Sequence, residues 1–387
     1  MTSVSLCLLL TAGAVAADPP SKPLNPAANK LCVEAVGLHM QNNPTAAYDK
    51  LKAALALEPK SRILLSYQEE LEPLAAFAAL DDHALKAPPE AEKSVEALAR
   101  YLVGPAKNDR EKARVIFRWI TDRIRYDTES FFSGKRADGS AAAVLKTRQS
   151  VCDGYANLFL ELAKQAGLEA VKINGYGKGY GFRPDEKITT NHAWNGVKID
   201  GAWQIIDSTW GAGSVDGSGK FVKKLQLFHF LTPPALAAFT HHPEDAALQY
   251  LSPPVPTAEF AKWPRLAPPF FQLGLKSDEL RKHLAGDKSV PNVFDYVGPR
   301  VKLVQGPLSE KLQKGTKVVF KAEAPPGVEL MLMNGKQFIP MQRVGDHLTA
   351  TITPDSGPLM LAMRVAAKKG EEAKREAKET EAEGDNA

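Results

Sequence analysis

The sequence predicts an α+β fold, with a helical region towards the N-terminus and a small β-sandwich towards the C-terminus. Apolar residues recur at helical spacing over residues 25–80. In the middle of the chain, two amphipathic helices precede two strand-like runs. Over residues 300–367, short alternating runs are separated by turns, a pattern typical of a β-sandwich.

Length and composition describe an ordinary soluble protein with a large core. The chain has 387 residues, enough for two or three domains, with 44% hydrophobic and 24% charged residues. The net charge of +4 is small, and arginine–aromatic clusters of the RNA-binding kind are lacking. We therefore expect no nucleic-acid partner.

The first 17 residues are predicted to be a signal peptide. An apolar run from Val4 to Val15 leads into the small residues Ala14, Ala16 and Ala17, although no Lys or Arg precedes it. A membrane anchor is the alternative, but about a dozen apolar residues span a bilayer poorly. We expect a secreted or periplasmic protein without a transmembrane segment after cleavage.

The chain has three cysteines, and Cys7 lies in the apolar run. A secreted protein could join Cys32 to Cys152, but two lone cysteines do not make a disulfide framework. Neither has a second Cys or His at ligand spacing, so we expect no structural zinc and no cofactor.

Residues 18–90 are predicted to form the helical region. The stretch "NNPTAAYDKLKAALALEPKS" resembles half of a tetratricopeptide repeat, but it has no second copy. One such unit cannot form a solenoid, so a helical hairpin that packs on a neighbour is the simpler interpretation. This region and the β-sandwich are candidate surfaces for a protein partner.

Three further stretches are predicted to be irregular. The segment 228–274 is rich in proline and aromatics, which excludes long helices and central strands, so we expect it to cover the rest of its domain. Residues 276–299 are interpreted as a linker. Residues 368–387 are charged, lack large apolar residues, and are predicted to be a disordered tail.

Two helices are predicted before the strands. Residues 108–127 place one apolar stripe at helical spacing, made of Ala113, Ile116, Phe117, Ile120 and Ile124. Residues 150–167, "SVCDGYANLFLELAKQAG", read as a second helix with Ser150 as its N-cap and Gly167 as its stop. Cys152 therefore lies in the first turn of a helix.

The stretch "HAWNGVKIDGAWQIID" predicts a β-hairpin, because Asp200-Gly201 favours a two-residue turn. In that register Ile199 faces Ala202, and His192 and Asp207 become diagonal neighbours on one face, about 7–8 Å apart. A slip of one residue would place them on opposite faces.

Cys152, His192 and Asp207 together suggest a catalytic triad. A helix N-terminus and a neighbouring imidazole activate a thiol, and a carboxylate orients the imidazole. Taken singly, each residue has a plainer interpretation: a buried small side chain, a structural histidine and a turn cap. The triad follows only if the hairpin packs across the start of the helix.

At these residues the sequence resembles the transglutaminase-like (transglutaminase/cysteine protease) superfamily. The matching pieces are "VCDGYANLFLELAKQAGLEAVKINGYGKG", "NHAWNGVKIDGAWQIIDSTWGAG" and "ARVIFRWITDRIRYD". The proline-rich stretch resembles the kyphoscoliosis-peptidase branch. The resemblance covers residues 91–275 and implies a papain-like core, in which a nucleophile helix packs on an antiparallel sheet.

The resemblance also implies roles for individual residues. Cys152 corresponds to the nucleophile, His192 to the base and Asp207 to the orienting acid. An oxyanion hole would combine the Cys152 backbone N–H with an upstream side chain, for which Gln149, Trp119 and Tyr126 are the candidates. Trp194 and Trp210 flank the triad positions and could wall the acyl site, or could simply be core or surface aromatics.

The implied reaction is acyl transfer through a thioester. Water as the acceptor gives a peptidase or amidase acting on a protein or peptide substrate, and a lysine amine gives a cross-linking transglutaminase. A binding or scaffold protein that retains the triad without turnover is the third possibility. The triad itself does not choose between hydrolysis and cross-linking, but an intact Cys, His and Asp favours an enzyme over a scaffold. A peptidase or amidase is the function that we predict.

Three weaker motifs remain. "GAGSVDGSGKF" lacks the ligand pattern of a calcium loop and reads as a flexible rim of the cleft. "GYGKGYG" lacks the Lys-Ser/Thr of a phosphate loop and reads as a turn or loop. In "THHP", adjacent histidines would point apart on a strand, so a solvated loop is expected and no metal site.

Overall fold

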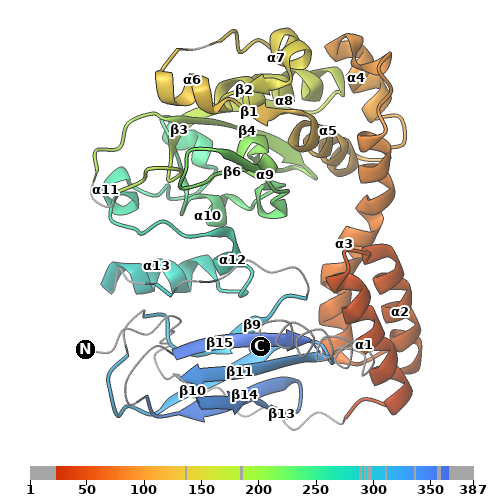
Figure 1. Cartoon of the computed structure of the whole chain (residues 1–387), viewed down its shortest axis with the longest axis vertical. Coiled ribbons are helices and arrows are strands. Elements are labelled where there is room, and N and C mark those ends of the chain that lie inside the picture. The colour runs from red at the N-terminus through yellow and green to blue at the C-terminus, as the bar shows by residue number, and fades with distance from the viewer. Residues whose placement is uncertain are drawn as a thin grey trace, which may run out of the picture. The chain divides into compact units, whose positions relative to one another are not determined.

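The computed structural model describes residues 23–135, 137–183, 186–286, 290–291, 293, 299–309, 312–334, 337–354 and 359–365. The predicted signal peptide (1–17) and charged tail (368–387) lie outside the described residues. The chain forms two compact units, one from residues within 1–75 and 269–387 and the other from residues 76–268 (Figure 1). The boundary falls inside helix α3 (Arg62–Leu85).

The first unit begins with the predicted helices. Helix α1 (Pro26–Met40) and helix α2 (Pro44–Leu57) form a hairpin, followed by α3. Asn25 and Asn43 cap the first two helices by accepting hydrogen bonds from backbone N–H groups of the first turn. The single helical hairpin predicted from the sequence is therefore present.

The C-terminal strands of this unit form two antiparallel sheets. One sheet has the order β13 (Gln342–Val344), β14 (His347–Ile352), β10 (Val318–Glu323) and β9 (Lys302–Gln305). The other has the order β12 (Gln337–Pro340), β11 (Val328–Asn334) and β15 (Leu359–Val365). This confirms the predicted β-sandwich. A helix, α13 (Ser277–Gly286), occupies the start of the stretch interpreted as a linker.

The second unit contains the two helices predicted in the middle of the chain. Helix α5 (Asp109–Arg123) buries its predicted apolar stripe, and helix α8 (Cys152–Gln165) buries the face that carries Tyr155, Leu158 and Phe159. The shorter helices are η1 (Ala91–Lys93), α4 (Val95–Leu102), α6 (Thr128–Ser133) and α7 (Ala141–Thr147). Two short strands, β1 (Arg125–Tyr126) and β2 (Gln149–Ser150), pair in parallel before α8.

A four-stranded antiparallel sheet supports this unit, in the order β5 (Ala202–Ile206), β4 (His192–Ile199), β3 (Ala170–Gly177) and β8 (His241–Pro243). Helix α8 packs against β3 and β4 (Figure 1). A helix on an antiparallel sheet is the core arrangement that the sequence predicted.

The β4–β5 hairpin has the predicted register. Ile199 pairs with Ala202, and the ladder continues to Asn195 opposite Ile206. Asp200 and Gly201 adopt φ of 53° and 79°, the left-handed conformations that a type I′ turn requires. The chain then leaves the ladder at Asp207, which caps helix α9 (Ser208–Ala212).

The proline-rich segment has no long helix and no central strand, as predicted. Its elements are η2 (Leu227–His229), α10 (Pro234–Ala237), the edge strand β8, η3 (Ala246–Gln249), α11 (Thr257–Phe260) and α12 (Pro268–Phe271). Before it, β6 (Gly213–Val215) and β7 (Phe221–Lys223) form a small hairpin. Within the described residues, no helix combines the length and the hydropathy needed to cross a membrane.

Candidate active site

Cys152 is the first residue of helix α8. The N-cap is Val151 rather than the predicted Ser150, because Ser150 belongs to strand β2 and is buried. No side chain caps this helix, so no capping oxygen competes for the N–H groups of its first turn. These groups and the helix dipole favour a negative charge at this position.

Two residues on, Gly154 lets the helix start lie close to strand β2. A Cβ atom at Gly154 would lie 2.1 Å from the Ser150 hydroxyl oxygen and 2.7 Å from a methyl of Val144. Only glycine fits this approach, which fixes the position of the thiol.

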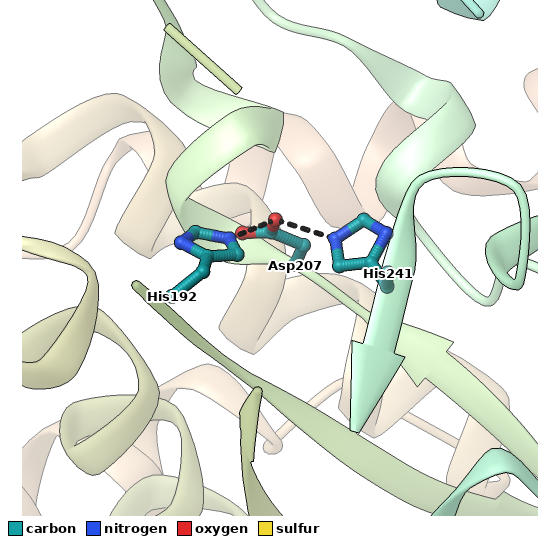
Figure 2. A group of neighbouring side chains, drawn as sticks. All are labelled: His192, Asp207 and His241. Atoms are coloured by element: carbon teal, nitrogen blue, oxygen red, sulfur yellow. Dashed lines mark hydrogen bonds and ion pairs between the residues drawn. The ribbon is translucent and has the colours of Figure 1, made fainter. Parts of the chain in front are cut away.

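His192 and Asp207 form a direct hydrogen bond. His192 Nε2 lies 2.7 Å from Asp207 Oδ2, and both side chains are buried (Figure 2). The sequence predicted diagonal neighbours, and the turn after β5 brings the two side chains into contact. Because Nε2 faces Asp207, the other ring nitrogen, Nδ1, is left to face Cys152, whose thiol is hydrogen bonded to His192.

The carboxylate of Asp207 accepts four hydrogen bonds. Oδ1 accepts from the backbone N–H groups of Thr209 (2.9 Å) and Trp210 (3.0 Å). Oδ2 faces the imidazoles of His192 (2.7 Å) and His241 (3.1 Å). Four bonds fill the acceptor capacity of a carboxylate, so the buried charge is fully satisfied.

Charge separation between Cys152 and His192 is favoured. Burial raises the pKa of the Cys152 thiol, but the hydrogen bond to His192 and the charge of its imidazolium outweigh burial, so the pKa lies below that of an ordinary thiol. Burial lowers the pKa of His192, but the charge of Asp207 and its hydrogen bond outweigh burial and raise the pKa to about 10. Both shifts favour a thiolate–imidazolium pair.

The same balance keeps Asp207 ionised. Burial raises its pKa, but the imidazoles of His192 and then His241 outweigh that effect and hold the pKa well below the usual range for aspartate.

His241 was not predicted as a site residue, and the solvated loop expected for "THHP" is wrong. His241 and His242 belong to edge strand β8, which pairs with β3, and both side chains are buried. They do point apart, as adjacent strand residues must. His241 faces Asp207, whereas His242 Nε2 lies 2.8 Å from the Thr257 hydroxyl.

Trp210 covers the imidazoles. Its ring stacks on His192 with centroids 4.7 Å apart and an angle of 18°, and it contacts His241 at 4.5 Å. Trp210 also lines the adjacent cleft, where the sequence placed it.

Trp194 does not line the cleft. It is 1% exposed and packs with Ile173, Ile205 and Ala237. The prediction that Trp194 walls the acyl site is wrong, because the proline-rich segment covers that face of the sheet.

The three candidates for the oxyanion side chain have different surroundings. Trp119 is buried in the helical core and donates its indole N–H to Glu92 (2.9 Å), which removes it as a candidate. The Gln149 amide is already used, because its oxygen accepts from Arg125 (2.9 Å) and its other end is hydrogen bonded to Asp127.

Tyr126 is the candidate that faces the site. It lines the cleft together with His192. Burial, with the nearby negative charges of Cys152 and Asp207, holds the pKa of Tyr126 above its ordinary value, so its hydroxyl keeps its proton and can donate it in a hydrogen bond.

A cleft of about 370 Å³ opens beside His192 and Trp210. Its walls include the β6–β7 hairpin, which the sequence predicted as a rim, and the loop after β3. Aromatic side chains at the mouth, Phe131 and Tyr180, are exposed and contact each other edge to face. No aspartate or glutamate lines the cleft among the described residues, whereas Arg265 does.

The glycines of "GYGKGYG" make room for aromatic rings. A Cβ at Gly175 would lie 2.7 Å from the Trp194 ring, and one at Gly177 would lie 3.0 Å from the rings of both His192 and Trp210. A Cβ at Gly179 would approach Trp210 to 3.1 Å. The stretch is the end of β3 and a loop, in agreement with the turn or loop that the sequence favoured over a phosphate site.

His192, Asp207 and His241 are also close enough to suggest a metal site, with ligand atoms within 4.8 Å of one another. Both Nε2 atoms, however, lie at hydrogen-bond distance from the same carboxylate oxygen, and the 2.7 Å between His192 Nε2 and Asp207 Oδ2 is shorter than the spacing of about 3.3 Å between ligand atoms around a tetrahedral zinc ion. Hydrogen bonding accounts for all three groups.

The family model of the transglutaminase-like superfamily matches residues 96–208, which include Cys152, His192 and Asp207. The matched residues lie within the second compact unit, residues 76–268. This confirms the resemblance drawn from the sequence.

Curated relatives agree with this assignment. This chain is similar to kyphoscoliosis peptidase of Mus musculus (38% identity over 162 residues, 41% of this chain and 24% of that protein). It is similar to kyphoscoliosis peptidase of Homo sapiens (35% over 190 residues, 48% and 28%). It is also similar to hillarin of Drosophila melanogaster (32% over 213 residues, 51% and 26%). The matches span about a quarter of the length of these relatives. His241 lies outside the family match of the transglutaminase-like domain.

Proposed function

We propose that this protein is a cysteine-dependent acyl-transfer enzyme that hydrolyses amide bonds of peptides or proteins. The observation that carries the proposal is the arrangement of Cys152, His192 and Asp207 beside an open cleft. A thiol at an uncapped helix start, a buried imidazole and a saturated carboxylate are the three parts that nucleophilic acyl transfer needs.

The reaction proceeds in two halves. The Cys152 thiolate attacks the carbonyl carbon of the substrate amide, and the electron pair of the C=O bond moves onto oxygen. When the C–N bond breaks, His192 Nδ1 gives its proton to the leaving amine, and a thioester remains on Sγ. His192 then takes a proton from water, the hydroxide attacks the thioester carbonyl, and the thiolate leaves as the acid product forms.

The negative oxygen of each tetrahedral intermediate needs donors. The backbone N–H of Cys152, in the first turn of α8, would supply one. Tyr126 is the side chain that supports the second position, because it lines the cleft beside His192 and keeps its phenolic proton. Replacing Tyr126 by Phe should lower kcat by about 10²-fold while leaving alkylation of Cys152 unchanged.

Water is the acceptor that the site favours. His192, the base that must activate water, lines the cleft. The curated relatives named peptidase support hydrolysis as well. A lysine amine would use the same residues and give a cross-link instead.

The test is a peptide library incubated with the wild type, with Cys152→Ala and with His192→Ala. Released amines that require Cys152 support hydrolysis. Incorporation of a fluorescent primary amine into a glutamine donor, without hydrolysis, would replace peptidase by transglutaminase. Labelling of Cys152 by a thiol probe no faster than labelling of Cys32 would point to a scaffold, because Cys32 is buried and burial raises its pKa to about 12.

We further propose that the enzyme acts after export, on the basis of the apolar N-terminal run. Sequencing the N-terminus of the protein purified from its native source tests this: a start near residue 18 supports export, and retention of the run contradicts it.

A further inference from the structure

His241 is a buried polar residue that the reaction steps above do not use. Its side chain is 4% exposed and comes from edge strand β8, outside the segment that matches the family. Figure 2 shows the Asp207 carboxylate between the rings of His192 and His241. His241 Nε2 lies 3.1 Å from Asp207 Oδ2, the same oxygen that His192 Nε2 contacts at 2.7 Å.

The hydrogen on His241 can be assigned from its two partners. A carboxylate only accepts, so Nε2 must carry the hydrogen that faces Asp207. At Nδ1 the Thr240 hydroxyl lies 2.8 Å away, closer than the 3.2 Å between that hydroxyl and the carbonyl of Ala237. In the neutral ring the Thr240 hydroxyl therefore donates to Nδ1, and Nε2–H donates to Asp207.

The surroundings of His241 favour this neutral form. Besides Asp207, the titratable groups facing its ring are His192, 5.8 Å away between centroids, and His229, 6.2 Å away. Trp194 and Trp210 cover the remaining sides. Burial lowers the pKa of His241, and Asp207 only partly offsets it, so the ring stays uncharged beside the His192 imidazolium.

We propose that His241 is a positioning residue of the active site, which holds Asp207 Oδ2 against His192 by donating a second hydrogen bond to it. The inference deepens the function proposed above and rests on it. Helix α9 fixes Oδ1 through two backbone N–H groups, and His241 fixes Oδ2. The carboxylate plane is thereby set, and with it the direction of His192 Nε2–H and the orientation of Nδ1 towards Cys152.

A purely structural role predicts something different. If His241 merely filled space and satisfied a buried acceptor, its loss would lower stability without changing the ionisation of Cys152. If it positions Asp207, its loss weakens the carboxylate–imidazolium contact, and the pKa of the thiol rises. The pH dependence of thiol alkylation separates the two roles, because it reports thiolate and needs no substrate.

The experiment measures carboxamidomethylation of Cys152 by iodoacetamide from pH 4 to 10, with mass spectrometry of the Cys152 peptide. His241→Phe keeps a flat ring but removes both nitrogens, and we expect alkylation at pH 6.5 to fall about tenfold, since a hydrogen bond to a charged group is lost. His241→Gln keeps an amide donor near the Nε2 position and should retain most of the wild-type rate.

His242→Phe is the matched control. It lies on the same strand, is buried, and faces Thr257 on the opposite side of the sheet. Its alkylation profile should equal that of the wild type. A wild-type profile in His241→Phe, or an equal shift in His242→Phe, would overturn the proposal.

A further variant keeps the test decisive where His241→Phe does not fold by circular dichroism. Thr240→Val removes the hydroxyl that fixes the tautomer and should shift the profile in the same direction by a smaller amount, and an unchanged profile in that variant contradicts the proposal. Absence of amide turnover in the wild type would count against the proposed function alone, because alkylation is measured without substrate.

Discussion

Replacing Asp207 by Asn probes the charge of the site with the least change of shape. Asparagine is as good an N-cap as aspartate, so its side-chain oxygen can still accept from the backbone N–H groups of Thr209 and Trp210. With the oxygen held there, the amide NH₂ must face His192 and His241. The amide would then oppose the Nε2–H donors of His192 and His241, which lie 2.7 and 3.1 Å from Asp207 Oδ2 in the wild type.

The variant forces His192 into the wrong tautomer. To accept from the amide, His192 Nε2 must lose its hydrogen, so a neutral ring carries its hydrogen on Nδ1, towards Cys152. Such a ring cannot take a proton from water at Nδ1, and it lacks the positive charge that stabilises the thiolate. An ordinary thiol is only about 1% ionised at pH 6.5, so alkylation of Cys152 should fall by up to about 100-fold. Turnover should fall by about 10⁴-fold, the usual cost of this change in a triad.

The assay combines three measurements. The rate of alkylation by iodoacetamide at pH 6.5 reports the fraction of Cys152 that is ionised, peptide turnover gives kcat, and the denaturant midpoint reports the stability of the fold. In the wild type, the imidazolium should persist until the pH approaches about 10, the pKa of His192. A variant with wild-type alkylation at pH 6.5 and an unchanged fold would refute the charge-pair reasoning.

Three further predictions concern the helix start and the cleft. Gly154→Ala should lower the free energy of unfolding by about 1–3 kcal/mol, because its Cβ would meet Ser150; an unchanged denaturant midpoint contradicts this. Lys178 is buried with its Nζ on two backbone carbonyls, and burial lowers its pKa to about 7. Above pH 7 the unfolded chain therefore binds more protons at Lys178 than the folded chain does. The free energy of unfolding of the wild type, relative to Lys178→Met, should rise with pH by up to about 1.4 kcal/mol per pH unit. A difference that does not depend on pH refutes this prediction. Arg265 lines a cleft in which the described residues place no carboxylate. Arg265→Glu should therefore raise KM for peptides that carry an acidic residue and leave KM unchanged for matched peptides with glutamine in its place. An equal rise of KM for both peptides would exclude an ionic contact.

Local signals were enough to predict that His192 and Asp207 lie together and that Cys152 begins a helix, whereas the packing of the hairpin across that helix start is not a local signal. The Asp200-Gly201 turn sets the register of the hairpin, and the register places His192 and Asp207 on one face. The helix that begins at Cys152 follows from apolar periodicity and Gly167. Each of these inferences depends on residues close together in the chain.

The features that were missed depend on partners far away in the chain. His241 joins the site because β8 pairs with β3, more than 60 residues earlier, and a three-residue strand ending in proline gives no periodic signal. Trp194 lies on the predicted face, yet the proline-rich segment buries it. The indole N–H of Trp119 donates to Glu92 instead of facing the site, and no local sequence pattern links these two residues.

The glycines at the end of β3 limit where substrate preference can change. A Cβ at Gly177 would crowd both His192 and Trp210, and one at Gly179 would crowd Trp210, so substitutions at this wall of the cleft would shift those rings. Ser214 and Val215 of strand β6, exposed Tyr180 and the stretch from Arg265 to Pro268 already carry side chains that line the cleft. Divergence among related proteins, and directed evolution of this one if the proposed function holds, should therefore act on those walls and leave the glycine wall intact.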